Sequence, residues 1–208
     1  MQDAVRLLDI HEKLTGTARG RRRGVEVLNK SALVFVTASW EAVVEDAAAQ
    51  LFDMLMKGAK SFEFIPTKVR ACATEMIRKS QDERRIWELA GEGWKSVLLT
   101  HREEILRRYI GPLNTPSSDN VDRLFESLIG LRHISSSWHW PKMSVASARS
   151  RLDEHLRVRA AVAHGLPTPA PITKPYVEQY VDFILRLGFK TIEAGDAHIR
   201  ELLRAPEL

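Results

Sequence analysis

The sequence predicts an all-α fold, and three observations support this prediction. Ala, Leu, Arg and Glu dominate the 208 residues, whereas Gly and Pro together number only 20. Apolar residues recur at helical spacing, and no strand pattern, internal repeat or low-complexity tract interrupts them. The content of 44% hydrophobic and 28% charged residues is that of a globular chain, which excludes wholesale disorder and fibrous classes. The length suits one domain, with or without an appendage.

The N-terminal region predicts a short helix followed by a basic loop. Residues 3–14 place Val5, Leu8 and Ile10 at helical spacing, and Thr15-Gly16-Thr17 ends the pattern. The only concentrated basic run follows, and it predicts either a solvated loop or a contact with phosphate. Its arginines are Arg19, Arg21, Arg22 and Arg23. We therefore expect residues 1–24 to precede a helical domain over residues 25–208, with the whole chain forming one continuous domain.

Residues 25–57 predict one long helix. They contain no Gly or Pro, and the middle of the segment is apolar on nearly every face. A helix with apolar residues all round is central to a core. Gly58 is a plausible stop for this helix.

The middle of the chain predicts shorter helices. Pro66 opens a helix that ends at Arg78, because proline is favoured in a first helical turn. Asp119 is expected to cap the helix that runs from Asn120 to Ile129. The two helices between these are expected over residues 82–89 and 94–110, divided by Gly91 and Gly93 and closed by Gly111-Pro112.

The C-terminal third predicts two strong helices. Residues 135–141 are irregular and contain Trp138 and Trp140, for which packing is favoured over stacking on bases. A helix is then expected from Ser144 to about Ala163, stopped by Gly165 and Pro167. A proline-rich connector leads to the last helix, over residues 174–203.

Charge and cysteine usage bound the function classes. The net charge of +4 is compatible with a polyanionic partner. The single cysteine, Cys72, excludes an internal disulfide and a cysteine-based zinc site, and it suits a reducing cytoplasm. No histidine spacing matches a metal site, so we expect neither a metal nor a cofactor. Residues 1–20 lack the apolar core of a signal peptide, and the apolar run 32–40 is too short to span a bilayer. We therefore expect a cytoplasmic location and no membrane partner.

The stretch from Leu152 to Gly165 carries the candidate chemistry. Arg159 follows Leu152 by seven positions and so shares its expected buried face. A buried guanidinium needs a carboxylate, a phosphate or an aqueous cleft. His164 falls in the last helical turn, where the negative end of the helix dipole stabilises positive charge. Glu41 lies in an apolar setting and is a candidate partner for Arg159, although such pairs also serve only to fix packing.

The order of three motifs resembles the HEPN superfamily (higher eukaryotes and prokaryotes nucleotide-binding), and in particular its RNA-ligase-associated RiboL-PSP branch. The resemblance covers approximately residues 25–187 and implies an all-α bundle built on one long central helix and a C-terminal motif helix. The motifs are Leu28-Asn29-Lys30-Ser31-Ala32 leading to Trp40-Glu41-Ala42, Ser137-Trp138-His139-Trp140, and Arg159-Ala-Ala-Val-Ala-His164-Gly165.

The resemblance implies a metal-independent endoribonuclease that leaves 2′,3′-cyclic phosphate and 5′-hydroxyl ends. His164 would move protons, Arg159 would bind the scissile phosphate, and Glu41 would orient Arg159. The resemblance also implies RNA as partner and a homodimer with a shared cleft. A toxin or phage-defence role, with a possible antitoxin protein, is typical of such domains.

Several alternatives remain open. Ala160 stands where the family usually has a polar residue, which favours a catalytically silent module that binds RNA or nucleotides. A helical dimerisation or interaction protein, with Arg159 and Glu41 purely structural, is a third possibility. Arg157 also fits the motif spacing with His164, and His155 could face the same cleft. These two residues and the four arginines of the basic loop are therefore possible RNA contacts.

Overall fold

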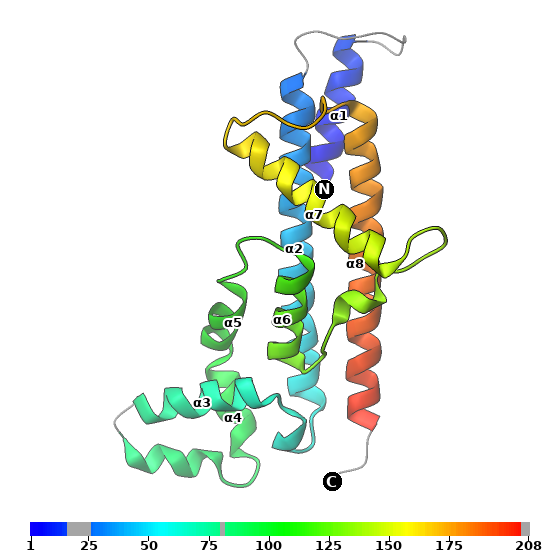
Figure 1. The fold of residues 1–208 in the computed structure, drawn as a ribbon. Coiled ribbons are helices and arrows are strands. Elements are labelled where there is room, and N and C mark those ends of the chain that lie inside the picture. The colour runs from blue at the N-terminus through cyan, green and yellow to red at the C-terminus, as the bar shows by residue number, and fades with distance from the viewer. Residues whose placement is uncertain (16–25, 80–81, 205–208) are drawn as a thin grey trace. The chain divides into compact units, whose positions relative to one another are not determined.

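The computed structural model describes residues 1–15, 26–79 and 82–204 (Figure 1). These residues form helices and no strand, apart from one isolated antiparallel bridge between Trp140 and Met143. The all-α prediction is therefore confirmed. The basic run with Arg19, Arg21, Arg22 and Arg23 lies outside the described residues.

The helices follow the order predicted from the sequence. Three short 3₁₀ segments, Phe62–Phe64, Glu83–Leu89 and Ile134–Ser137, lie between them. The α-helices are α1 (Gln2–Thr15), α2 (Glu26–Gly58), α3 (Thr67–Lys79), α4 (Gly93–Thr100), α5 (Arg102–Ile110), α6 (Ser118–Ile129), α7 (Val145–Ala163) and α8 (Lys174–Arg204).

Three details of the prediction were wrong. The segment expected as a helix over residues 82–89 is a 3₁₀ helix. The helix expected over residues 94–110 is divided at His101, whose φ of −97° and ψ of 9° end α4 and start α5. The N-cap of α6 is Ser117 rather than Asp119, because the Ser117 hydroxyl accepts a hydrogen bond from the backbone N–H of Asn120 at 3.4 Å.

The chain divides into two compact units. The first unit comprises residues 1–43 and 138–190, and the second comprises residues 44–137 and 191–208. The helices α2 and α8 each contribute to both units. The expected division at residue 24 stays a prediction.

The core of the first unit is built around the first half of α2. Trp40 is fully buried and meets Trp138 edge-on, with ring centroids 5.8 Å apart. The side chain of Thr37 lies 3.1 Å from the Tyr180 hydroxyl of α8, and the Asn29 amide donates to the carbonyl of Ile172 at 2.9 Å. These contacts attach α2 to Trp138 before α7, to Ile172 after α7 and to Tyr180 of α8. They confirm that Trp138 packs in the core.

The core of the second unit is built around the second half of α2. A Cβ atom at Gly195 would overlap the side chain of Leu51, so glycine allows α8 to approach α2 closely there. Arg102 of α5 donates two hydrogen bonds to the Asp53 carboxylate, at 2.6 and 2.8 Å. This bidentate pair ties α5 to α2.

Within the described residues, α2 is long and apolar enough to cross a membrane by length and composition alone. The central helix of an all-α core has the same properties. Many apolar side chains of α2 are buried inside the protein, which fits this second description. They include Ala32, Leu33, Val36, Trp40, Val44, Leu51, Phe52 and Leu55.

Candidate functional site

The motif helix α7 has well-defined caps at both ends. At its N-terminus the Ser144 hydroxyl accepts a hydrogen bond from the backbone N–H of Ser147 at 3.2 Å. At its C-terminus the N–H of Leu166 donates to the carbonyl of Ala161 at 2.8 Å, and the N–H of Gly165 donates to Val162 at 3.2 Å. This pair of bonds is the Schellman motif. Gly165 has a φ of +66°, a conformation that glycine adopts without strain.

This cap fixes the positions of the two motif residues. His164 is the C-cap residue of α7 and its side chain is exposed. Arg159 lies in the last two turns of the helix and is half-buried. Its Nε atom is buried and has no hydrogen-bond partner among the described residues. A buried donor without an acceptor is costly and uncommon in folded proteins, and an acceptor on a bound ligand would remove this cost.

Arg157 is in a different setting from Arg159. Its side chain is exposed, and its Nε donates to the backbone carbonyl of Asp153 at 3.3 Å. Arg157 therefore has a local partner on α7, whereas Nε of Arg159 has none among the described residues.

The expected ion pair between Glu41 and Arg159 is not formed. In the described part of the chain no hydrogen bond or ion pair joins their side chains, although both are half-buried in the first unit. Burial raises the pKa of Tyr180 to about 12, and the hydrogen bond with Thr37 and the charge of Arg159 act against this rise. Helical periodicity assigned Arg159 to the correct buried side of α7, but it did not fix the direction of the long side chain.

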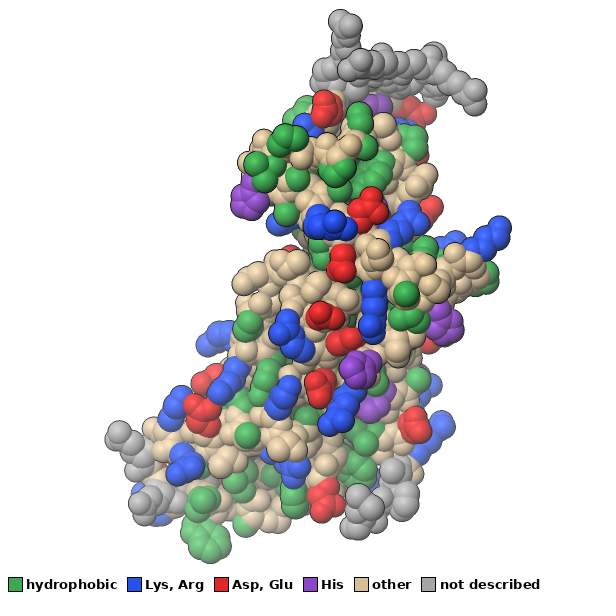
Figure 2. Space-filling view, in the orientation of Figure 1, with side chains coloured by type: hydrophobic (Ala, Val, Ile, Leu, Met, Phe, Trp, Pro, Cys, Tyr) green, Lys and Arg blue, Asp and Glu red, His purple; other side chains and the backbone are tan. Residues whose placement is uncertain are grey.

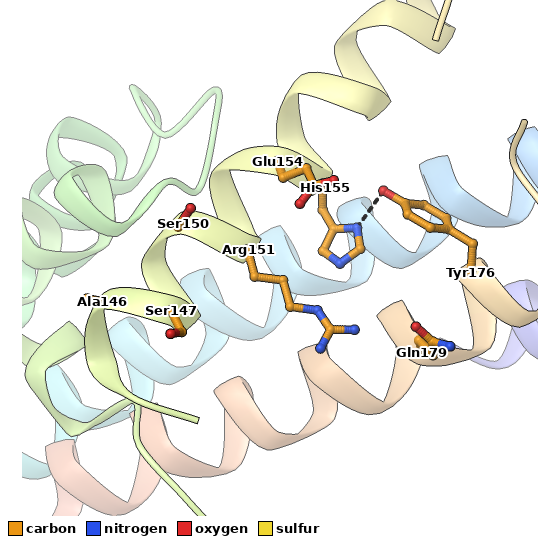
Figure 3. A pocket seen from close by; sticks show the side chains of 8 residues that line it. All are labelled: Ala146, Ser147, Ser150, Arg151, Glu154, His155, Tyr176 and Gln179. Atoms are coloured by element: carbon orange, nitrogen blue, oxygen red, sulfur yellow. Dashed lines mark hydrogen bonds between the residues drawn. The ribbon is translucent and has the colours of Figure 1, made fainter. Parts of the chain in front are cut away.

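His155 lies in a second polar cluster on the same helix. A cavity of about 660 Å³, open to solvent, lies between α7 and α8 and is shown in Figure 3. Its lining residues are Ala146, Ser147, Ser150, Arg151, Glu154 and His155 from α7, and Tyr176 and Gln179 from α8.

His155 forms part of the wall of this cavity. Its side chain is 3% exposed, and its Nδ1 atom lies 2.9 Å from the hydroxyl of Tyr176. Its Nε2 atom is buried and has no hydrogen-bond partner among the described residues. Burial, and to a smaller extent the charge of Arg151, lowers the pKa of His155 to about 4. The imidazole is therefore neutral at physiological pH.

Arg151 is the cation of this cluster. Its guanidinium lies over the ring of Phe183, 5.1 Å from the centroid, and none of the described carboxylates forms an ion pair with it. It also lines an adjoining cavity of about 250 Å³ together with Trp140, Met143, Gln179, Asp182, Phe183 and Arg186. Arg151 and Gln179 are common to both cavities.

Surface charge adds little to this picture. On the face shown in Figure 2, Lys and Arg side chains are interspersed with Asp and Glu rather than gathered into one basic patch. Charge on this face does not mark a nucleic-acid site by itself.

The family model RiboL-PSP-HEPN matches residues 1–193. The chain belongs to this family. The match confirms the resemblance inferred from the three motifs, and it extends beyond the residues 25–187 on which that resemblance was based. Membership indicates an RNA-related function for this HEPN domain. No curated protein and no solved structure matches the chain significantly.

Sequence reasoning missed the residues that surround His155 in this HEPN domain. Arg151, Tyr176 and Gln179 were not singled out, although Arg151 precedes His155 by four residues and so lies on the same helical face. No comparable signal identifies Tyr176 and Gln179, because they come from another helix. Within the described ranges, no three His, Cys, Asp or Glu side chains converge as metal ligands would.

Proposed function

We propose that this HEPN domain is a metal-independent endoribonuclease in which Arg159 and His164 carry the reaction. The observation that supports the proposal is the Arg-x4-His motif at the capped end of α7, in a chain that the family model matches over residues 1–193. The motif arginine has a buried Nε that finds no partner in the part of the chain that the structure describes, and the motif histidine is open to solvent. Glu41 remains a candidate for a supporting role that does not depend on pairing with Arg159.

The proposed reaction is an internal transesterification. The ribose 2′-oxygen forms a bond with the adjacent phosphorus, and the bond from phosphorus to the 5′-oxygen breaks. The products are a 2′,3′-cyclic phosphate and a 5′-hydroxyl. An imidazole such as that of His164 transfers protons to and from these oxygens, and a guanidinium such as that of Arg159 offsets the charge that develops on the phosphate.

The homodimer is proposed from the resemblance to HEPN ribonucleases, and helix geometry is compatible with it. Five residues of α-helix separate Arg159 from His164 by about 7.5 Å along the axis and about 140° around it. One protomer therefore presents the two side chains on different sides of α7. A second protomer that faces the first across a two-fold axis supplies the missing partner, so that the site is shared. Sedimentation at micromolar concentration is expected to give a dimer, and a monomer would contradict this part of the proposal.

The test of activity is incubation of the purified protein with total RNA in the presence of EDTA, with the fragment ends identified. We expect 2′,3′-cyclic phosphate and 5′-hydroxyl ends. His164→Ala and Arg159→Ala are expected to abolish cleavage. Arg157→Ala is the matched comparison, because it removes an exposed arginine of the same helix and is expected to reduce cleavage less than either of these variants. Undiminished cleavage by His164→Ala would overturn the assignment, and loss of activity only in Arg157→Ala would show that the motif register is wrong.

The residue after the motif arginine supports a second candidate function. Ala160 is half-buried and carries no hydrogen-bonding group. If cleavage requires a hydrogen-bonding side chain at position 160, this HEPN domain binds RNA without cutting it. Salt-sensitive RNA binding without fragments, together with activity restored by Ala160→Asn, would favour this candidate over the nuclease.

The proposed biological role is that of a cytoplasmic toxin or phage-defence effector controlled by an antitoxin protein. Induced expression in a bacterial host is expected to arrest growth for the wild type and not for His164→Ala. Equal growth of the two strains would contradict the toxin role.

A further inference from the structure

The cavity between α7 and α8 holds two features that the proposed cleavage reaction does not use. One is Arg151, a guanidinium without a carboxylate partner among the described residues. The other is Nε2 of His155, which is buried and has no partner within the described ranges, although the residue lines an open cavity. We propose that this cavity binds a nucleotide, with the phosphate held between Arg151 and Nε2 of His155.

Arg151 is prepared to bind an anion. It is half-buried, and stacking on the Phe183 ring restricts its orientation. Because the guanidinium is already ordered, little conformational entropy is lost when a phosphate binds. Its planar donors match two phosphate oxygens at once.

His155 supplies a second donor. Burial raises the pKa of Tyr176, so the phenol stays protonated at neutral pH and can donate to Nδ1 of His155 across the 2.9 Å contact. With Nδ1 accepting, the neutral imidazole carries its proton on Nε2. Figure 3 shows the His155 ring and the Arg151 guanidinium extending into the same space, with Tyr176 and Gln179 opposite. An anion in that space accepts from both residues.

The remaining lining residues select the rest of the ligand. Glu154 contributes an exposed carboxylate, which disfavours a bare anion but accepts hydrogen bonds from sugar hydroxyls. Ser147, Ser150 and Gln179 add neutral donors and acceptors. The volume of about 660 Å³ lies in the range of small-molecule sites. A phosphate would pair with Arg151, and the hydroxyls of an adjacent sugar would donate to the carboxylate of Glu154. A nucleotide carries both groups.

The nucleotide has two possible sources, a free nucleotide or a unit of an RNA strand. Arg151 precedes Arg159 by eight residues, about 12 Å along α7. A strand that lies along this helix could therefore occupy the cavity and reach the motif end. This second version rests on the proposed function, whereas binding of a free nucleotide does not.

The test follows the imidazole resonances of His155 by NMR in the full-length protein. Separate titrations use 5′-AMP, adenosine, inorganic phosphate and a short single-stranded RNA. We expect 5′-AMP or the RNA to shift the His155 signals with saturation, and adenosine and inorganic phosphate to bind at least tenfold more weakly. Arg151→Gln is expected to weaken binding at least tenfold. Arg204→Gln is the charge-matched control on α8, because Arg204 is exposed and outside both cavities, and it is expected to bind as the wild type does.

Each outcome decides the proposal. Binding of 5′-AMP identifies a free nucleotide as the source, binding of RNA alone identifies the strand, and dependence on Arg151 is required in both cases. No shift with either ligand overturns the proposal, as does binding that Arg151→Gln leaves unchanged. Circular dichroism of Arg151→Gln establishes that the variant is folded. If nucleotide binding is intact but no RNA fragments form, the nuclease assignment fails while the cavity proposal stands.

Discussion

The imidazole ring of His155 stacks on the phenol ring of Tyr180, with centroids 3.9 Å apart and ring planes 21° apart. Tyr176 meets the same imidazole edge-on at 5.2 Å, and Phe183 lies at 5.7 Å. Three aromatic residues of α8 thus enclose one histidine of α7. This enclosure joins the two helices and keeps the histidine neutral.

Stability is expected to depend on pH through His155. The folded protein protonates this residue only near pH 4, whereas the unfolded chain does so near 6.5. Between pH 4 and 6.5, His155 therefore carries a proton in the unfolded state that it lacks in the folded state. The contribution of the neutral imidazole is fully present above pH 6.5 and is lost as the pH falls towards 4, by roughly 3 kcal/mol in total. Urea unfolding at pH steps from 7.5 to 4 measures this change.

The matched variant for that experiment is His155→Phe, which keeps an aromatic ring at this position. Its unfolding free energy is expected to vary less between pH 6.5 and 4.5, a window that lies above the usual carboxylate range. An equally steep pH dependence in this variant would show that another group is responsible.

The hydrogen bond between Tyr180 and Thr37 is expected to stabilise the first unit. Tyr180→Phe should lower the unfolding free energy by about 1 kcal/mol, because Thr37 keeps its second contact, to the carbonyl of Leu33 at 3.2 Å. Thr37→Val tests the other side of the bond. In the double variant the loss should be smaller than the sum of the single losses, and strict additivity would argue against a direct coupling.

The turn at Gly165 is expected to be sensitive to substitution. A Cβ atom there has open space, so the cost of Gly165→Ala comes from the positive φ alone, about 1–2 kcal/mol. Gly165→Asn should cost less, because asparagine tolerates this conformation. Thermal unfolding of the two variants measures the difference, and equal melting temperatures for Ala and wild type would mean that the turn is not formed.

The link between Asp122 and Ser135 is expected to hold α6 to the following segment in the second unit. The carboxylate accepts from the Ser135 backbone N–H at 2.8 Å and from its hydroxyl at 2.7 Å. Asp122→Ala should cost about 1–3 kcal/mol, since it leaves buried donors without these acceptors. Ser135→Ala removes only the hydroxyl and should cost less in chemical denaturation. The reverse order would contradict this description.

The sequence predicted the helices well where glycine and proline mark their ends. The long helix expected over residues 25–57 is α2, Glu26–Gly58, and the helix expected over 174–203 is α8, Lys174–Arg204. The interruption at His101 was missed because no Gly or Pro marks it. Gly and Pro identify positions that disfavour helical geometry. They do not identify a position at which tertiary packing interrupts a segment of high helix propensity.

The candidate site could be predicted only in part. The motif spacing and Gly165 predicted the end of α7, because caps are local. The predicted ion pair between Glu41 and Arg159 is not formed, because a position on a helical face restricts the direction of a long side chain without fixing its partner. The surroundings of His155 depend on Tyr176 and Tyr180 of another helix. Only the packed structure brings those residues to it.

The division of the chain into two units has a consequence for protein synthesis. The first unit needs residues 138–190 to complete it, and the whole of residues 44–137 must leave the ribosome before they do. At about 5–20 residues per second, this delay lasts roughly 5–20 s. During that interval Trp40 lacks its contact with Trp138, and Thr37 lacks its contact with Tyr180. The nascent chain thus presents an apolar helix to chaperones before the motif helix has been translated.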